Sequence, residues 1–132
     1  MKLLVDTNIF ISAMISDSRT REILMDSGHT FYAPEYSKTE ILGYDELIMD
    51  KSGMNQEEFR VLLDLIMKNI EIIPKEEYEE ELEQARDELE DSKDAPFLAA
   101  AITKNYKIWS DDKHLQNQEK AEALTTEQLI HR

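Results

Sequence analysis

The sequence contains no cysteine. Disulfide bonds, thiolate zinc sites and thiol nucleophiles are therefore excluded. A chain without cysteine suits a reducing compartment, so we expect a cytoplasmic protein. Long apolar runs are also missing, because Leu3, Leu4 and Val5 are followed at once by Asp6. This run is far shorter than a secretion signal or a membrane span, and we expect no membrane association.

Basic residues are scarce. The chain has 15 Lys and Arg against 29 Asp and Glu, which gives a net charge of −14. Such a surface repels phosphate, so bulk attraction to nucleic acid is not expected. The chain nevertheless has 41% hydrophobic residues over 132 positions. This composition and length predict a single folded domain, residues 1–132, rather than a disordered chain.

Short β-favouring runs alternate with helical patterns. Strands are predicted at Lys2–Val5, Phe31–Ala33, Ile70–Ile73, Tyr106–Ser110 and Ala123–Leu124. Helices are predicted at Ile9–Met14, at Thr20–Ser27, from Tyr36 to about Met49, after the capping pair Asn55 and Glu58, at Asp94–Thr103 and at the C-terminus. This alternation predicts parallel βαβ units and a three-layer α/β/α sandwich.

The segment Lys75–Asp94 differs in composition from the rest of the chain. It holds eleven acids and three bases, a local net charge of −8. Leu82, Ala85 and Leu89 keep a thin apolar stripe through it. We therefore predict a solvated surface helix, which could also form a patch for a basic partner.

Several carboxylates fall where an α/β sheet binds ligands, at the carboxyl ends of strands. Asp6 ends the first strand, and Asp111 and Asp112 follow the fourth. Asp94 opens the helix before that strand, and Glu40 lies early in the helix after the second. An all-oxygen cluster of this kind suits Mg²⁺ or Mn²⁺. Such an ion would relieve the repulsion between the acids and activate a water molecule for attack on phosphorus.

Plainer structural roles are open to the same residues. Asp6 could end a strand and bind the next turn, and Asp94 or Asp91 could stabilise a helix N-terminus. Ser110 and Asn8 could each cap a turn or helix.

At two positions the sequence does not decide which acid belongs to the site. Glu40 on its own is one helix glutamate among several. Asp111 and Asp112 are adjacent and should point in different directions, which leaves Asp111 open between supporting the site and facing solvent; we favour Asp112 as the ligand.

Four motifs, taken in order, resemble those of the PIN domain family. They are Leu3-Leu4-Val5-Asp6-Thr7-Asn8, Pro34 with Glu40, the run Asp91–Ala101, and Ile108-Trp109-Ser110-Asp111-Asp112-Lys113. The resemblance covers nearly the whole chain. It implies a metal-dependent ribonuclease fold with a parallel sheet of about five strands. Most small stand-alone members are toxins of the VapC type.

The resemblance also implies a role for each acid. Asp6, Glu40, Asp94 and Asp112 correspond to the four family acids, which are catalytic and hold one or two Mg²⁺ or Mn²⁺ ions. Glu40 would orient or deprotonate the attacking water.

Other positions would support these acids. Asn8 and Ser110 resemble residues that steady the first and fourth acids, and Asp91 and Asp111 are further supporting candidates. The chain departs from the common pattern at Asp111, often Asn or Gly, and at His114, often an acid. These departures leave the number of metal ions open.

The expected function is hydrolysis of RNA phosphodiester bonds, with a toxin–antitoxin role, an antitoxin partner and a homodimer as extensions of it. One alternative is a non-catalytic interaction module, which the acidity favours. Lysines are nonetheless available to RNA at Lys38, Lys51, Lys104, Lys107 and Lys113. A second alternative is an aspartate-nucleophile phosphatase of the haloacid dehalogenase type, although Asn8 stands where that chemistry wants a second aspartate.

The net charge constrains the nuclease without excluding it. More than half of the charge lies in Lys75–Asp94, and two bound Mg²⁺ ions would return +4 to the acids. Because charges are screened over about 8 Å at physiological salt, the local field can differ from the total. We expect weak, salt-sensitive and metal-dependent RNA binding.

Overall fold

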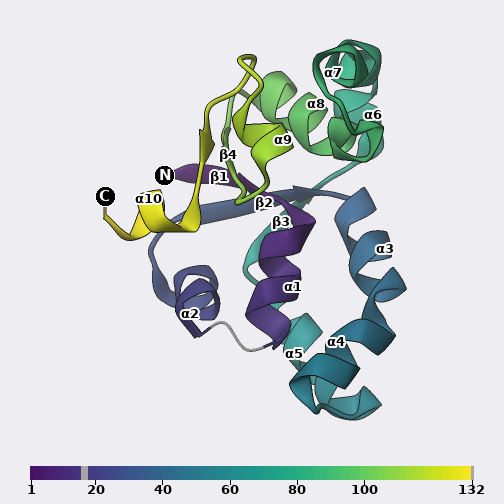
Figure 1. The fold of residues 1–132 in the computed structure, drawn as a ribbon, viewed down its shortest axis with the longest axis vertical. Helices are drawn as coiled ribbons and strands as arrows, with labels where there is room; N and C mark the ends of the chain where they lie inside the picture. Colours follow the sequence, from purple (N-terminus) through teal and green to yellow (C-terminus); the bar gives the residue numbers. More distant parts are fainter. Residues whose placement is uncertain (16–17, 132) are drawn as a thin grey trace.

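The computed structural model describes residues 1–15 and 18–131, in which strands and helices alternate (Figure 1). The strands are β1 (Lys2–Val5), β2 (Thr30–Pro34), β3 (Ile70–Ile73), β4 (Lys107–Trp109) and β5 (Ala123–Leu124). They form one five-stranded sheet in the order β3-β2-β1-β4-β5, and every neighbouring pair is parallel. The predicted parallel sheet is confirmed.

The central strand β1 lies between β2 and β4. Leu4 pairs with Tyr32 on one side and with Ile108 on the other. The chain first builds outward through β2 and β3, and then crosses to the other side of β1 for β4 and β5. The strand order therefore reverses between β1 and β4, where open α/β sheets form their binding crevice.

Helices cover both faces of the sheet. One face carries α1 (Thr7–Ile15), α2 (Ser18–Asp26), α3 (Tyr36–Gly43), α4 (Asp45–Ser52), α5 (Gln56–Met67) and α10 (Thr126–Ile130). The other carries α6 (Lys75–Tyr78), α7 (Leu82–Glu88), α8 (Ala95–Lys104) and α9 (Lys113–Gln116). Figure 1 shows the strands between these two groups of helices. The predicted three layers are confirmed.

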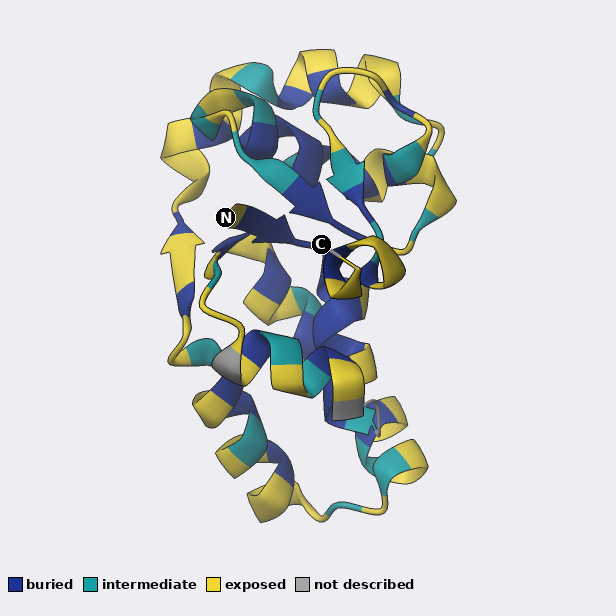
Figure 2. Ribbon diagram, turned by 90° about the vertical axis from the view of Figure 1, so that its left-hand side faces the viewer, coloured by how far each residue is buried: buried dark blue, intermediate teal, exposed yellow. Residues whose placement is uncertain are grey.

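Alternation along the strands builds two cores. Leu3, Val5 and Trp109 point into one, and Leu4 and Ile108 into the other. Successive strand residues face opposite sides of a sheet, so β1 is buried on both faces. Figure 2 shows this buried central layer between exposed outer helix surfaces.

The helix that begins after Asn55 is capped as predicted. The Glu58 backbone N–H donates to Asn55 Oδ1 at 2.8 Å, and the Asn55 N–H donates to Glu58 Oε1 at 3.0 Å. This capping box satisfies two N–H groups that a helix N-terminus otherwise leaves unpaired.

The predicted continuous helix from Tyr36 to about Met49 is wrong. Two helices, α3 and α4, meet at Tyr44, whose φ of −104° and ψ of 14° leave helical geometry. Gly43 favours an ending there because glycine loses the most backbone entropy in a helix. Asp45 and Glu46 then suit a new N-terminus, where negative charge is stabilised.

The acidic segment is also not one helix. It consists of α6, the 3₁₀ turn Glu79–Glu81, α7 and the 3₁₀ turn Ser92–Asp94. Glu76 and Glu80 would stand one helical turn apart in a continuous helix, and such like-charge pairs are destabilising. The prediction of a solvated surface holds, because most acids here are exposed while Leu82 and Ala85 are buried. Every helix in the described ranges is too short or too polar to span a lipid bilayer.

Candidate active site

Asp6 lies at the carboxyl end of β1 and is only 2% exposed. Its Oδ2 accepts a hydrogen bond of 2.9 Å from the Ser110 hydroxyl, and its carboxylate also accepts from the backbone N–H of Asn8. The pKa of Asp6 is raised to about 6, chiefly by burial. The charges of Asp112 and Glu40 contribute to the rise, and the two hydrogen bonds oppose it. The carboxyl is thus buried beside other acids.

Asp94 lies at the end of the Ser92–Asp94 turn and is 9% exposed. Its Oδ2 is buried and has no hydrogen-bond partner. Burial raises the pKa of Asp94 to about 7, with Asp112, Asp6 and Asp91 adding to the shift and His114 opposing it. An unpaired buried carboxylate oxygen is costly, and a positive ligand would relieve that cost.

Glu40 comes to the same edge of the sheet on α3. Its Oε1 accepts a hydrogen bond of 2.7 Å from the Thr7 hydroxyl, and Thr7 directly follows Asp6. The same hydroxyl lies 3.4 Å from the buried Ser37 hydroxyl. Burial raises the pKa of Glu40, while Thr7 and the ammonium of Lys93 lower it. Sequence reasoning missed Thr7 and Ser37; the position of Thr7 beside Asp6 was the available signal.

The two acids after β4 point to different partners. The Asp112 carboxylate caps α9 by accepting from the His114 N–H at 2.8 Å, and its own N–H donates to the Ser110 hydroxyl at 3.0 Å. Asp111 instead accepts from the N–H and the hydroxyl of Thr126, at 2.8 and 2.7 Å. Asp111 therefore ties the loop after β4 to the start of α10.

Two supporting candidates have local roles. The Asn8 side chain is exposed, and Asn8 donates a hydrogen bond to Asp6 through its backbone N–H. The Asp91 side chain accepts from the Lys93 N–H at 3.0 Å and so caps the Ser92–Asp94 turn. A hollow of about 190 Å³ beside the acids is lined by Asn8, Ile9, Ser12, Asp111 and Asp112.

The acids fit a hard divalent cation by chemistry. They offer oxygen donors only, they raise one another's pKa values, and Asp94 carries an oxygen with no partner. Within the described ranges, no group of three or more His, Asp or Glu side chains is arranged to hold a metal ion. The four predicted acids therefore lie near enough to affect one another's charge, but they do not form a metal coordination shell. They are Asp6, Glu40, Asp94 and Asp112.

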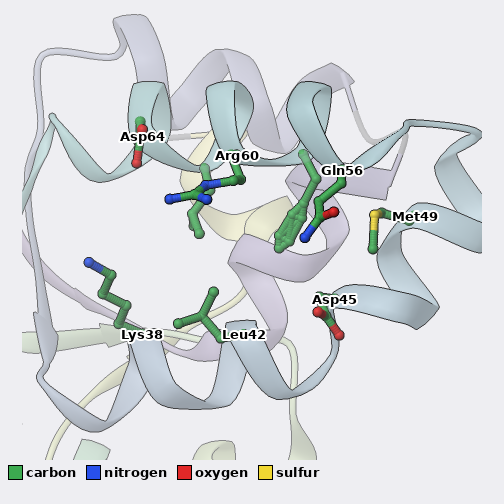
Figure 3. Close-up of a pocket in the computed structure, with 9 residues that line it drawn as sticks. Lys38, Leu42, Asp45, Met49, Gln56, Arg60 and Asp64 are labelled. Atoms are coloured by element: carbon green, nitrogen blue, oxygen red, sulfur yellow. The ribbon is translucent and has the colours of Figure 1, made fainter.

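A larger hollow, of about 320 Å³, lies away from these acids between α3, α4 and α5 (Figure 3). Leu42 and Met49 contribute apolar surface, and Lys38, Arg60 and Asp64 contribute charges of both signs. The four predicted catalytic acids do not line it. It is separate from the site built on β1 and β4.

Comparison with known proteins agrees with the fold and the motifs. The chain belongs to the PIN domain family, whose sequence profile matches residues 4–129. The curated proteins include no match to the chain.

Two solved structures share the fold. VapBC2 from Rickettsia felis, bound to a DNA fragment from its promoter, is 19% identical with a TM-score of 0.65, and the likeness covers 95% of this chain and 98% of that chain. A toxin–antitoxin complex from Klebsiella pneumoniae is 19% identical with a TM-score of 0.70, covering 94% of this chain and 97% of that chain.

Proposed function

We propose that this chain is a metal-dependent endoribonuclease. The observation that carries the proposal is the pair Asp6 and Asp94, two buried carboxyls with raised pKa values at the point where the strand order reverses. Buried acids at such an edge are costly unless a ligand uses them. Membership of the PIN domain family supports a nuclease over the phosphatase alternative.

Each acid has a task in the proposed reaction. Asp6, Asp94 and Asp112 would hold Mg²⁺ or Mn²⁺, together with Glu40. When bound, the ion would neutralise charge on the scissile phosphate and favour the ionisation of water. Glu40 would orient or deprotonate the attacking water, because Thr7 holds its carboxylate at the edge of the site.

Ser110 positions two of the acids. Its hydroxyl donates to Asp6 and accepts from the Asp112 N–H, so the ends of β1 and β4 share one hydrogen-bonding group. A carboxylate held in this way loses little further freedom when a ligand binds. Asn8 assists through its backbone N–H.

We further propose that the chain acts as the toxin of a toxin–antitoxin pair in the cytoplasm. The support is the fold that it shares with the Rickettsia felis and Klebsiella pneumoniae complexes. A small DNA-binding antitoxin should then be encoded beside this chain and should co-purify with it. A homodimer is proposed on the family resemblance.

The test uses structured RNA and a generic phosphomonoester, each with and without Mg²⁺ or Mn²⁺. We expect RNA cleavage that requires the metal and is lost in Asp6→Asn and Asp94→Asn. RNA cleavage that survives both substitutions, or turnover of the phosphomonoester alone, would contradict the proposal. Activity on neither substrate would favour the non-catalytic interaction module.

A further inference from the structure

Two tyrosine side chains are exposed, one at the start of α3 and one at the residue that follows its end. The chain has ten Phe, Trp and Tyr residues, all within the described ranges. The phenylalanines, the tryptophan, Tyr32 and Tyr78 are buried, and Tyr106 is half-buried with its ring 4.3 Å from that of Tyr32. Tyr36 and Tyr44 are 37% and 45% exposed. Among the Phe, Trp and Tyr rings, the exposed ones are thus confined to α3 and the residue that ends it.

These two tyrosines flank Glu40. Positions 36, 40 and 44 are four residues apart, so they follow one face of α3. Lys38 and Leu42 lie on the other side of the helix and line the separate hollow of Figure 3. The tyrosine face of α3 is therefore the face that carries the proposed catalytic glutamate.

Lys93 brings a positive charge to the same place. Burial raises the pKa of Tyr36, and the neighbouring Glu40 and Tyr44 raise it further. The ammonium of Lys93 lowers it. The same ammonium lowers the pKa of Glu40. Lys93 is exposed and forms no ion pair with another described side chain. Glu40 thus lies between the two tyrosines in helical spacing, and the Lys93 ammonium is close enough to act on its charge.

Two of the lysines named from the sequence are engaged in ion pairs, whereas Lys113 beside Asp112 is exposed like Lys93. Lys104 is paired with Glu77, and Lys107 with Glu122 at 3.2 Å. With a net charge of −14, attraction to the RNA backbone is a poor source of affinity. Stacking of bases on aromatic rings is independent of charge, and each base contributes about 1–3 kcal/mol.

We propose that Tyr36 and Tyr44 form a base-stacking subsite for single-stranded RNA, with Lys93 as a phosphate contact beside it. The inference rests on the proposed ribonuclease function and names how that site holds its substrate. Bases that are unpaired expose the faces that such rings need, whereas duplex RNA hides them. The subsite therefore selects unpaired nucleotides next to the cleaved bond.

The test measures cleavage of a single-stranded RNA by the unaltered chain and by Tyr36→Ala, Tyr36→Leu and Tyr36→Phe, with the same series at Tyr44. Alanine and leucine should each raise KM about tenfold with kcat changed by less than about twofold, since stacking is lost. Phenylalanine keeps the ring and should retain KM. Leucine preserves apolar bulk, so it limits the loss of packing, and the thermal melt of each variant checks its stability.

Two controls sharpen the experiment. Val61→Ala removes a side chain that is 55% exposed on α5, outside the acids and the tyrosines, and should leave KM and kcat unchanged. A substrate with abasic nucleotides beside the cleaved bond should be cleaved equally by the unaltered chain and the tyrosine variants. That equality would show that the rings act on bases.

The outcomes separate the two proposals. RNA cleavage with an unchanged KM in the alanine and leucine variants would overturn the subsite and leave the ribonuclease intact. An equal rise in KM for phenylalanine, or on the abasic substrate, would also overturn stacking. No cleavage by the unaltered chain would overturn the ribonuclease and the subsite with it.

Discussion

The Ser110 hydroxyl donates a hydrogen bond of 2.9 Å to Asp6 Oδ2, and the two residues are 104 positions apart in the chain. The Asp112 N–H donates to the same hydroxyl at 3.0 Å. One small side chain therefore links the Asp6 carboxylate to the loop after β4, in addition to the backbone pairing of β1 with β4. The link matters for the candidate site because Asp6 and Asp112 follow different strands, β1 and β4.

Replacing Ser110 should weaken both stability and activity. In Ser110→Ala, buried Asp6 loses a donor, and an unmade buried hydrogen bond costs about 1–3 kcal/mol. We expect a urea midpoint lowered accordingly and RNA cleavage reduced at least about tenfold. Ser27→Ala, at an exposed serine, is the control. Native stability and native cleavage in Ser110→Ala would contradict the role given to this hydroxyl.

The metal-free protein should lose stability as the pH rises. The pKa of Asp6 is raised to about 6 and that of Asp94 to about 7 in the folded state, from an ordinary value of 3.8. Between these values the folded chain binds more protons than the unfolded chain, so stability falls from about pH 4 to pH 7. Thermal unfolding with EDTA across this range measures the effect.

Mg²⁺ should reverse that loss. Because the ion competes with protons for the same oxygens, its stabilisation of the folded chain should grow between pH 5 and pH 8. Melting temperatures with Mg²⁺ and with EDTA give the difference at each pH. A Mg²⁺ effect that is the same at both pH values would argue against binding at Asp6 and Asp94.

Asp94→Asn should make the metal-free chain more stable while it inactivates the nuclease. The substitution removes a buried charge whose Oδ2 has no partner. We expect a gain of about 1 kcal/mol at pH 8 that disappears near pH 4, where the native carboxyl is already neutral. Asp64→Asn, at an exposed position on α5, is the matched control and should show neither effect. An Asp94→Asn chain that is less stable at pH 8 would contradict this account.

Thr7→Val should shift the pH dependence of cleavage. The Thr7 hydroxyl donates to Glu40 and lowers the pKa of that carboxyl. Without it the pKa rises, so if Glu40 acts as a base, the acid limb of the pH–rate profile moves to higher pH. Thr7→Ser keeps the hydroxyl and should restore the native profile. A reduced rate with an unmoved limb would assign Thr7 to packing alone.

The main features of the fold were predictable because they depend on local patterns. Apolar runs that stop at Asp6 and Pro34 mark strand ends, and the carboxyl-end rule then collects the acids at one edge. The break at Gly43 was missed because the apolar spacing continues across it into Ile48. Helical spacing alone does not weigh glycine entropy or adjacent like charges.

Partners far apart in the chain could not be predicted from local patterns. Thr7 reaches Glu40 across 33 positions, and Asp111 reaches Thr126 across 15. Each contact depends on the order of the strands in the sheet. Local sequence patterns do not give that order. The adjacent pair Asp111 and Asp112 shows this: identical side chains at neighbouring positions have partners in different parts of the molecule.

The chain contains one tryptophan, Trp109, and its position next to Asp6 makes it an intrinsic fluorescence probe of the candidate site. Its carbonyl accepts the Asp6 N–H at 3.0 Å, and its indole N–H donates to the Thr126 hydroxyl at 3.0 Å. Tryptophan emission responds to the polarity and hydrogen bonding around the indole. Its emission would therefore report events at Asp6 in the unmodified protein, without a dye and without cleaving any RNA.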